Sequence, residues 1–244
     1  METLDLKTAQ PRIQSALVLG MEGVGKTRFI GTCPKPILLY SFDGGYRTLA
    51  GMEGVRAKVF TEKDRRTPKV AMEFEGELQK YLRGEEPLYK WPDGKEEPFK
   101  TVALDPLSSW SLSKMHHVQY INRTVDKKPT FDEWDLLLKS GVDLINQCLQ
   151  VVEAQGATLV CTAHIQSDKD EDTGQLWFLP AMLGSIRNVI GRYFDLVAIL
   201  KTDKKPDGKV DYQLCTVGER RERARIRLPA HLDGSGTLVV AFGD

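Results

Sequence analysis

A glycine-rich segment near the start of the chain has the spacing that cradles phosphate. Residues 20–27 read Gly-Met-Glu-Gly-Val-Gly-Lys-Thr and match the pattern GxxxxGK[ST]. Glycine allows several backbone N–H groups to turn toward one anion, and a following helix points its positive end the same way. In such a loop Lys26 reaches the β- and γ-phosphates of ATP, and the Thr27 hydroxyl binds Mg²⁺. The nucleotide contacts expected from this motif are Gly20, Glu22, Gly23, Val24, Gly25, Lys26, Thr27 and Arg28.

An acidic residue at the end of an apolar run supplies the second half of such a site. Asp105 follows Val102-Ala103-Leu104, and a carboxylate in this place holds Mg²⁺ in P-loop proteins. The alternative is an aspartate that only caps the next turn. The residue after it is Pro106, so the group that orients or deprotonates water must come from elsewhere in the chain.

Two further strand ends carry candidate catalytic groups. Asp43 ends the strand that follows the P-loop helix and is the candidate base, with Glu53 and Glu62 as weaker alternatives. A turn-forming role before Gly44 is the competing interpretation. His164 follows a fourth apolar strand, where it could sense the γ-phosphate or the attacking water; the alternative is a structural histidine.

The late part of the chain is locally basic. Residues 201–227 contain nine Lys/Arg and five Asp/Glu. Arg223, Arg225 and Arg227 alternate, so on a strand they would share one face. Such a row suits phosphate contacts to a nucleic acid or an arginine finger that reaches a neighbouring subunit's ATP. A charged edge strand that resists aggregation is the alternative.

The elements that must position these groups alternate between apolar runs and amphipathic segments. Helices are expected from Lys26, over about 69–83, after residue 105, and from Thr130 to about Ala154, the last opened by a Thr130–Glu133 capping box. This alternation predicts an α/β fold with a mostly parallel central sheet, flanked by helices, in the strand order 5-1-4-3-2. Residues 201–244 read as turn-linked β segments, a C-terminal β extension. The five runs expected as buried strands are 16–19, 36–42, 101–104, 159–163 and 194–200.

Composition restricts the class of protein. The chain has 244 residues, with 34 basic and 34 acidic side chains, which argues against a uniformly basic coat but leaves room for a local nucleic-acid patch. The longest apolar runs, of about seven residues, are far too short to span a bilayer. The first residues lack the pattern of a secretory signal. The four cysteines show no CxxC spacing, so reduced thiols and a cytoplasmic location are expected.

The order of these elements resembles the RecA-type recombinase core. It is more closely similar to the phage-encoded RecA-like P-loop ATPases of the single-strand-annealing group. This resemblance implies a flexible arm at 1–12, a RecA-like ATPase core at 13–230 and a C-terminal β segment of the same domain at 231–244. It rests on GMEGVGKT at 20–27, LLYSFDGG at 38–45, TVALDPLSSW at 101–110, LVCTAH at 159–164, IRNVIGRYFDLVAIL at 186–200 and LCTVGERRERARIRLP at 214–229.

The resemblance also implies roles for individual residues. Asp43 falls where such proteins carry a catalytic Glu, and because Asp is one methylene shorter, slow hydrolysis is expected. His164 falls at the position of a polar γ-phosphate sensor. Arg225 and Arg227 fall where cations reach ATP across a subunit interface.

Two segments fall where DNA-binding loops occur in the RecA-like proteins. These are Met115–Lys128 and Gln166–Leu179. The second is acidic, so its contribution would come from base stacking on Trp177 and Phe178 rather than from phosphate contacts; ordinary core packing is the alternative for these aromatics.

The expected function is therefore a slow, DNA-stimulated ATPase that binds single-stranded DNA in recombination or annealing. It would act as a homo-oligomer, ring or filament, with ATP at the subunit interface and without a membrane. The opposite charges of 168–172 and 220–227 suit head-to-tail contact. A single-strand-binding protein is a further candidate partner, and a phage origin would place the protein in the cytoplasm of a bacterial host. The alternatives are a P-loop nucleotide or small-molecule kinase, and a non-hydrolysing switch or loader in phage DNA replication.

Overall fold

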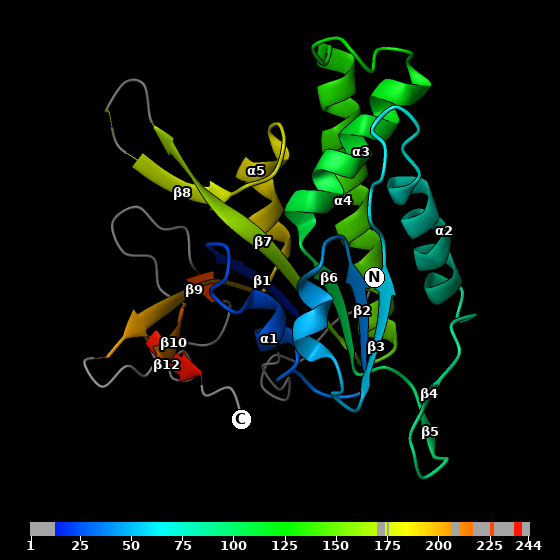
Figure 1. The fold of residues 1–244 in the computed structure, drawn as a ribbon, viewed down its shortest axis with the longest axis vertical. Coiled ribbons are helices and arrows are strands. Elements are labelled where there is room, and N and C mark those ends of the chain that lie inside the picture. Colours follow the sequence, from blue (N-terminus) through cyan, green and yellow to red (C-terminus); the bar gives the residue numbers. More distant parts are fainter. Residues whose placement is uncertain are drawn as a thin grey trace, which may run out of the picture.

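The apolar runs of the sequence lie side by side in the centre of one large sheet (Figure 1). The computed structural model describes residues 13–169, 174, 176–205, 210–216, 225–226 and 237–240. The expected arm at 1–12 and most of the segment at 231–244 lie outside the described residues. In chain order the elements are β1 (Ser15–Gly20), α1 (Lys26–Ile30), β2 (Ile37–Ser41), η1 (Gly45–Leu49), β3 (Val55–Val59), α2 (Val70–Leu82), β4 (Tyr89–Lys90), β5 (Glu96–Glu97), β6 (Thr101–Asp105), α3 (Leu107–Ile121), α4 (Phe131–Ala154), β7 (Thr158–Lys169), β8 (Leu176–Pro180), α5 (Ile186–Val189), η2 (Ile190–Tyr193), β9 (Leu196–Lys204), β10 (Val210–Cys215), β11 (Arg225–Ile226) and β12 (Thr237–Val240).

The strand order brings the ends of distant segments together. Through the described strands the sheet runs β12-β10-β9-β1-β7-β6-β2-β3, with β11 beside β9 and β8 beside β7. The six strands from β9 to β3 pair in parallel. The stretch β9-β1-β7-β6-β2 places the five expected strands in the order 5-1-4-3-2. Because these strands are parallel, the carboxyl ends of β1, β2, β6 and β7 meet at one edge.

Helices cover both faces of this sheet, and the side chains of β2 point alternately toward the two layers of helices. Leu38 and Tyr40 point into the core cluster that also contains residues of α2, α3 and α4. Ile37 and Leu39 point to the opposite face, into a cluster with α1 and η1. All four side chains are fully buried. Successive residues of a strand face opposite sides, so the single apolar run of β2 packs against the helices on both faces of the sheet.

The helix that follows the expected capping box confirms that prediction. Thr130 Oγ1 accepts from the N–H of Glu133 at 3.4 Å, and Glu133 Oε2 accepts from the N–H of Thr130 at 2.7 Å. The first helix, expected from Lys26, is the short helix α1 and ends at Ile30. None of the helices in the described ranges has both the length and the apolar character needed to cross a bilayer.

Two segments differ from expectation. The edge strand β3 was not predicted, because its charged Arg56 and Lys58 interrupt the apolar pattern. The segment expected as a DNA-binding loop at 166–179 is in large part a β-hairpin: β7 continues past the sheet and pairs with β8. In the described part of the chain after residue 201, β10 pairs antiparallel with β9 and with β12.

Candidate nucleotide-binding site

The P-loop joins β1 to α1 and turns through conformations that favour glycine. Gly23 has φ 76° and Gly25 has φ 91°, both in the left-handed region. A side chain there would strain the backbone. Gly25 immediately precedes α1, so the loop and the first residues of the helix lie at the edge where the parallel strands end.

The side chain of Lys26 folds back onto the start of this loop. Its ammonium donates to the carbonyl of Gly20 at 3.0 Å and to that of Met21 at 2.8 Å, and lies 3.3 Å from Nδ1 of His164. The residue is only 7% exposed. Burial lowers the pKa of Lys26, while the nearby Asp105 carboxylate acts in the opposite direction. The structure therefore places one desolvated cation where the motif expects it.

Asp105 is held by hydroxyl groups from two other elements. Thr27 Oγ1 donates to Asp105 Oδ2 at 2.6 Å, and Thr162 on β7 donates to Oδ1. Asp105 is 2% exposed, and burial raises the pKa of its carboxyl group, while the two hydroxyl donors oppose that change. A buried carboxylate that receives two hydrogen bonds is oriented before any ligand arrives.

Asp43 lies beside this pair, two residues after the end of β2. Its Oδ1 accepts a hydrogen bond from the N–H of Gly45 at 2.7 Å. A Cβ placed on Gly45 would stand 2.7 Å from Thr27 Oγ1, 2.9 Å from Asp43 Oδ1 and 3.4 Å from Asp105 Oδ2. Three oxygens thus surround one point that only a glycine leaves open.

Oxygens of this kind are the ligands that Mg²⁺ prefers. The donor set therefore fits a divalent cation, with Thr27 and Asp105 as its ligands from the protein. Within the described part of the chain no group of three or more His, Cys, Asp or Glu side chains could hold a metal alone. Nucleotide phosphates would complete the coordination, and the cation would supply positive charge against them.

His164 reaches the site because β7 lies directly beside β1. The two strands pair with Gly20 opposite His164. The N–H of His164 donates to Ser108 Oγ at 2.9 Å, which ties β7 to the first turn of α3. Burial, and then the charge of Lys26, lower the pKa of the His164 imidazole. A neutral imidazole is consistent with its contact to an ammonium.

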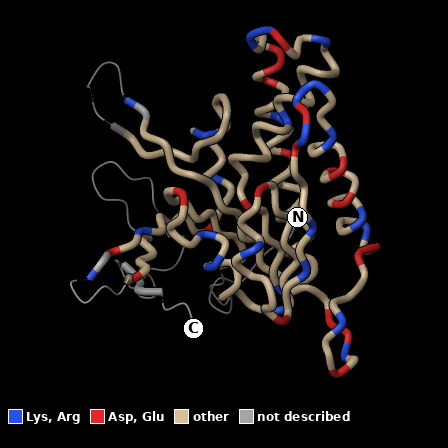
Figure 2. The backbone as a smooth tube through the Cα atoms, viewed as in Figure 1, with Lys and Arg blue, Asp and Glu red and all other residues tan. Residues whose placement is uncertain are grey.

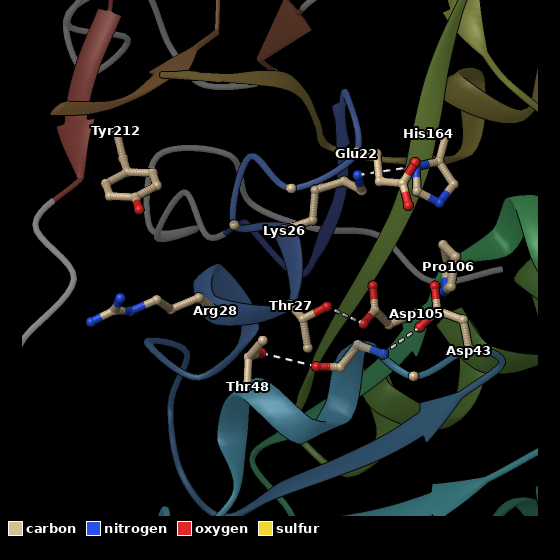
Figure 3. Close-up of a pocket in the computed structure, with 14 residues that line it drawn as sticks. Glu22, Lys26, Thr27, Arg28, Asp43, Thr48, Asp105, Pro106, His164 and Tyr212 are labelled. Carbon is tan, nitrogen blue, oxygen red and sulfur yellow. Dashed lines mark hydrogen bonds between the residues drawn. The ribbon is translucent and has the colours of Figure 1, made fainter. Parts of the chain in front are cut away.

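These groups line one cavity of about 590 Å³ (Figure 3). Of the expected nucleotide contacts, Gly20 and Val24 do not line it: the Gly20 carbonyl holds Lys26, and Val24 packs on the neighbouring apolar cluster. The weaker base candidates are also elsewhere, since Glu53 and Glu62 each line a different hollow. The lining residues are Glu22, Gly23, Gly25, Lys26, Thr27, Arg28, Asp43, Gly44, Gly45, Thr48, Asp105, Pro106, His164 and Tyr212.

Sequence reasoning missed several of the residues at this site. Thr162 carried a usable signal, because it alternates with His164 and so shares its face of β7. Thr48, which lines the cavity, donates to the carbonyl of Gly45 at 2.9 Å. Tyr212 enters from the antiparallel strand β10, far from the motif, and no local pattern marks it.

The expected arginine row is described only in part. The backbone of Arg225 belongs to β11 and pairs opposite Val197 of β9. Val197 in turn pairs with Leu17 of β1, three residues before the P-loop begins at Gly20. Arg223 and Arg227 lie outside the described residues.

A family model described as the AAA domain matches residues 12–228, which is most of the chain. The chain belongs to the AAA domain family. No curated protein is similar enough to count as a match. This AAA domain is a P-loop ATPase domain, so family membership implies binding and hydrolysis of a nucleotide, usually with Mg²⁺. The cavity of the AAA domain contains the lysine, hydroxyl and carboxylates that such a reaction uses.

Proposed function

We propose that this AAA-type ATPase binds single-stranded DNA and hydrolyses ATP slowly as a RecA-like oligomer, in recombination or annealing. The observation that supports DNA binding is a second hollow, of about 440 Å³, between the loop after β3 and the turn from α3 to α4. It overlaps Met115–Lys128, the first expected DNA segment. Its lining residues are Arg66, Tyr120, Arg123, Thr124, Val125, Asp126 and Lys127.

The chemistry of this hollow suits a flexible polyanion with aromatic bases. Arg66, Arg123 and Lys127 offer three cations for phosphates, and Tyr120, half exposed, offers a ring. The one carboxylate, Asp126, is 3.4 Å from the guanidinium of Arg65. Base stacking on an aromatic ring tolerates any sequence, because every base has a π face. Figure 2 shows that this end of the molecule, at the outer turn between α3 and α4, carries charged positions of both signs.

The helix α3 connects the hollow to the nucleotide cavity. It begins two residues after Asp105 and ends at Ile121, beside the hollow. Fifteen residues of helix span about 22 Å. Near its start, Ser108 holds the backbone of His164. A shift of the outer end of α3 on DNA binding would therefore be transmitted to Asp105 and His164 in the ATP site. This connection supports DNA-stimulated turnover.

The oligomer is proposed from the expected cross-subunit role of Arg225 and Arg227. Arg225→Ala should keep nucleotide binding and lose turnover. Asp105→Ala should also lose turnover, because it removes a ligand of the metal. If the arginine acts on a neighbour, a mixture of the two inactive proteins regains part of the activity, because some interfaces combine an intact arginine with an intact acid. A mixture that stays inactive at every ratio contradicts an intersubunit site.

The salt dependence of binding to a fluorescent oligothymidylate tests the DNA part. For single strands, each phosphate neutralised contributes a slope of about −0.7 in log K against log salt. Arg123→Ala and Lys127→Ala should each reduce that slope, while Tyr120→Ala should weaken binding without changing the slope. Lys95→Ala, on the β4–β5 hairpin at the opposite end of the molecule (Figure 1), is the matched control. Binding that none of the three variants weakens more than this control contradicts the proposed surface.

A further inference from the structure

One aromatic ring lines the nucleotide cavity at the end away from the acids. Tyr212 comes from β10, and Figure 3 shows it on the same side as Arg28 and opposite Asp43 and His164. The other described lining residues are polar, charged or small, apart from Pro106. A half-buried tyrosine in such surroundings is a surface for a flat, apolar ligand group.

The register of β10 directs the Tyr212 side chain toward the nucleotide cavity. Leu214 is two residues further along and therefore shares its face of the strand. Leu214 is buried in a cluster that also contacts Val24 of the P-loop and Phe29 of α1. The backbone of Tyr212 pairs with Thr202 of β9 on one side. Because β10 is paired along its length and Leu214 anchors its inner face, the ring is placed by the sheet itself.

The direction of a bound nucleotide follows from the opposite end of the cavity. In a P-loop the lysine reaches the β- and γ-phosphates and the threonine binds the metal. Here those groups are Lys26 and Thr27, next to Asp105 and Asp43. The terminal phosphate thus belongs at the acidic end, and the nucleoside extends in the other direction, toward Arg28 and Tyr212.

We propose that the ring of Tyr212 is the surface on which the base of the bound nucleotide stacks. The inference rests on the nucleotide binding that the AAA domain implies, and it adds the residue that recognises the base. Stacking requires no proton transfer and no hydrogen bond from the phenol, so phenylalanine should replace tyrosine. Loss of one aromatic–base stack weakens binding by about 5- to 150-fold.

Comparison of ADP with inorganic pyrophosphate tests the proposal, because only ADP carries a base. The affinity of each, with Mg²⁺, is measured by isothermal titration calorimetry for the full chain and for Tyr212→Ala and Tyr212→Phe. Val210→Ala is the matched control, since Val210 lies on the same face of β10 and does not line the cavity. Melting temperatures establish that each variant is folded.

The proposal expects Tyr212→Ala to lose about 5- to 150-fold in ADP affinity, with the pyrophosphate affinity unchanged and with Tyr212→Phe and Val210→Ala like the unmodified chain. An equal loss for both ligands overturns it, because Tyr212 would then support the loop and not the base. An unchanged ADP affinity overturns it as well. If the unmodified chain binds neither ligand, nucleotide binding itself has failed, and that outcome is recognised before any variant is compared.

Discussion

Nζ of Lys26 lies 3.3 Å from Nδ1 of His164, and this contact joins the P-loop to the neighbouring strand β7. Strand register explains it, since Gly20 at the start of the loop pairs directly opposite His164. An ammonium can only donate, so His164 accepts through an unprotonated Nδ1. The P-loop lysine and the expected γ-phosphate sensor are thus in contact within one chain.

This contact predicts the titration of His164. Burial, together with the charge of Lys26, lowers the pKa of the imidazole below its ordinary value of 6.5. Between the lowered pKa and 6.5 the unfolded chain binds more protons than the folded one. The contribution of His164 to stability therefore rises with pH across that window and is lost on acidification.

Proton NMR of the nucleotide-free protein measures this directly, with His164→Gln to assign the signal. The midpoint of His164 should lie below 6.5 and should rise in Lys26→Met, which removes the like charge. A midpoint at or above 6.5 in the unmodified chain contradicts the geometry.

Lys26→Ala should reduce kcat/KM for ATP by about 100-fold or more, because it removes a cation aimed at the phosphates. Its stability should be kept or increased, since burial of the ammonium already lowers the pKa of Lys26. Steady-state hydrolysis and thermal melting give the two values. Lys80→Ala, on an exposed position of α2, is the control and should behave as the unmodified chain. Equal rates in both variants would show that the P-loop lysine is not used.

Gly45→Ala should weaken use of the Mg²⁺ nucleotide, since its Cβ would stand within 3.0 Å of Thr27 Oγ1 and Asp43 Oδ1. A displacement of these oxygens by a few tenths of an ångström is expected to cost about 10- to 100-fold in kcat/KM. Gly44→Ala is the matched variant, because its nearest neighbour is Arg47 Nη1 at 3.9 Å. The loss should be much larger at Gly45 than at Gly44; similar losses would mean that crowding of the three oxygens is not the cause.

Most of the site was predictable because its residues obey two simple patterns. The P-loop is consecutive in sequence, so its spacing alone defines it. Asp43, Asp105 and His164 each follow an apolar run, and parallel strands bring such ends to one edge. Hence a pattern read one strand at a time predicted residues that meet only in the folded sheet.

The unpredicted parts depend on tertiary packing. The strand β3 alternates charged with apolar residues, and only pairing with β2 makes it a strand. Tyr212 reaches the cavity through the register of an antiparallel extension, which no local pattern encodes. The closeness of Gly45 to Thr27 is likewise a property of the assembled fold and not of either segment alone.

Glu133 predicts a pH-dependent stability at the turn that carries the proposed DNA surface. Burial raises the pKa of its carboxyl group, but hydrogen bonds from Thr124, the backbone of Thr130 and Asn122 outweigh burial and lower it. A lowered pKa means that the ionised group stabilises the fold above the unfolded value of about 4.5. This stabilisation is lost as the pH falls through the folded value.

Glu133→Gln should therefore lose about 1.5–3 kcal/mol at pH 7, the range for hydrogen bonds to a charged group. Urea denaturation should show that the difference from the unmodified chain narrows below pH 4.5. Glu153→Gln, on an exposed position of the same helix, serves as the control. A difference that is the same at both pH values would show that the charge of Glu133 does not matter.

In the function proposed above, one chain joins an ATP site to a surface for single-stranded DNA. The most direct measurement is steady-state ATP hydrolysis with and without an oligothymidylate, over a range of protein concentration, with Lys26→Ala as the blank. DNA should increase the rate, and the specific activity should rise cooperatively with protein concentration. A rate that is the same with and without DNA, and strictly proportional to protein concentration, would contradict it.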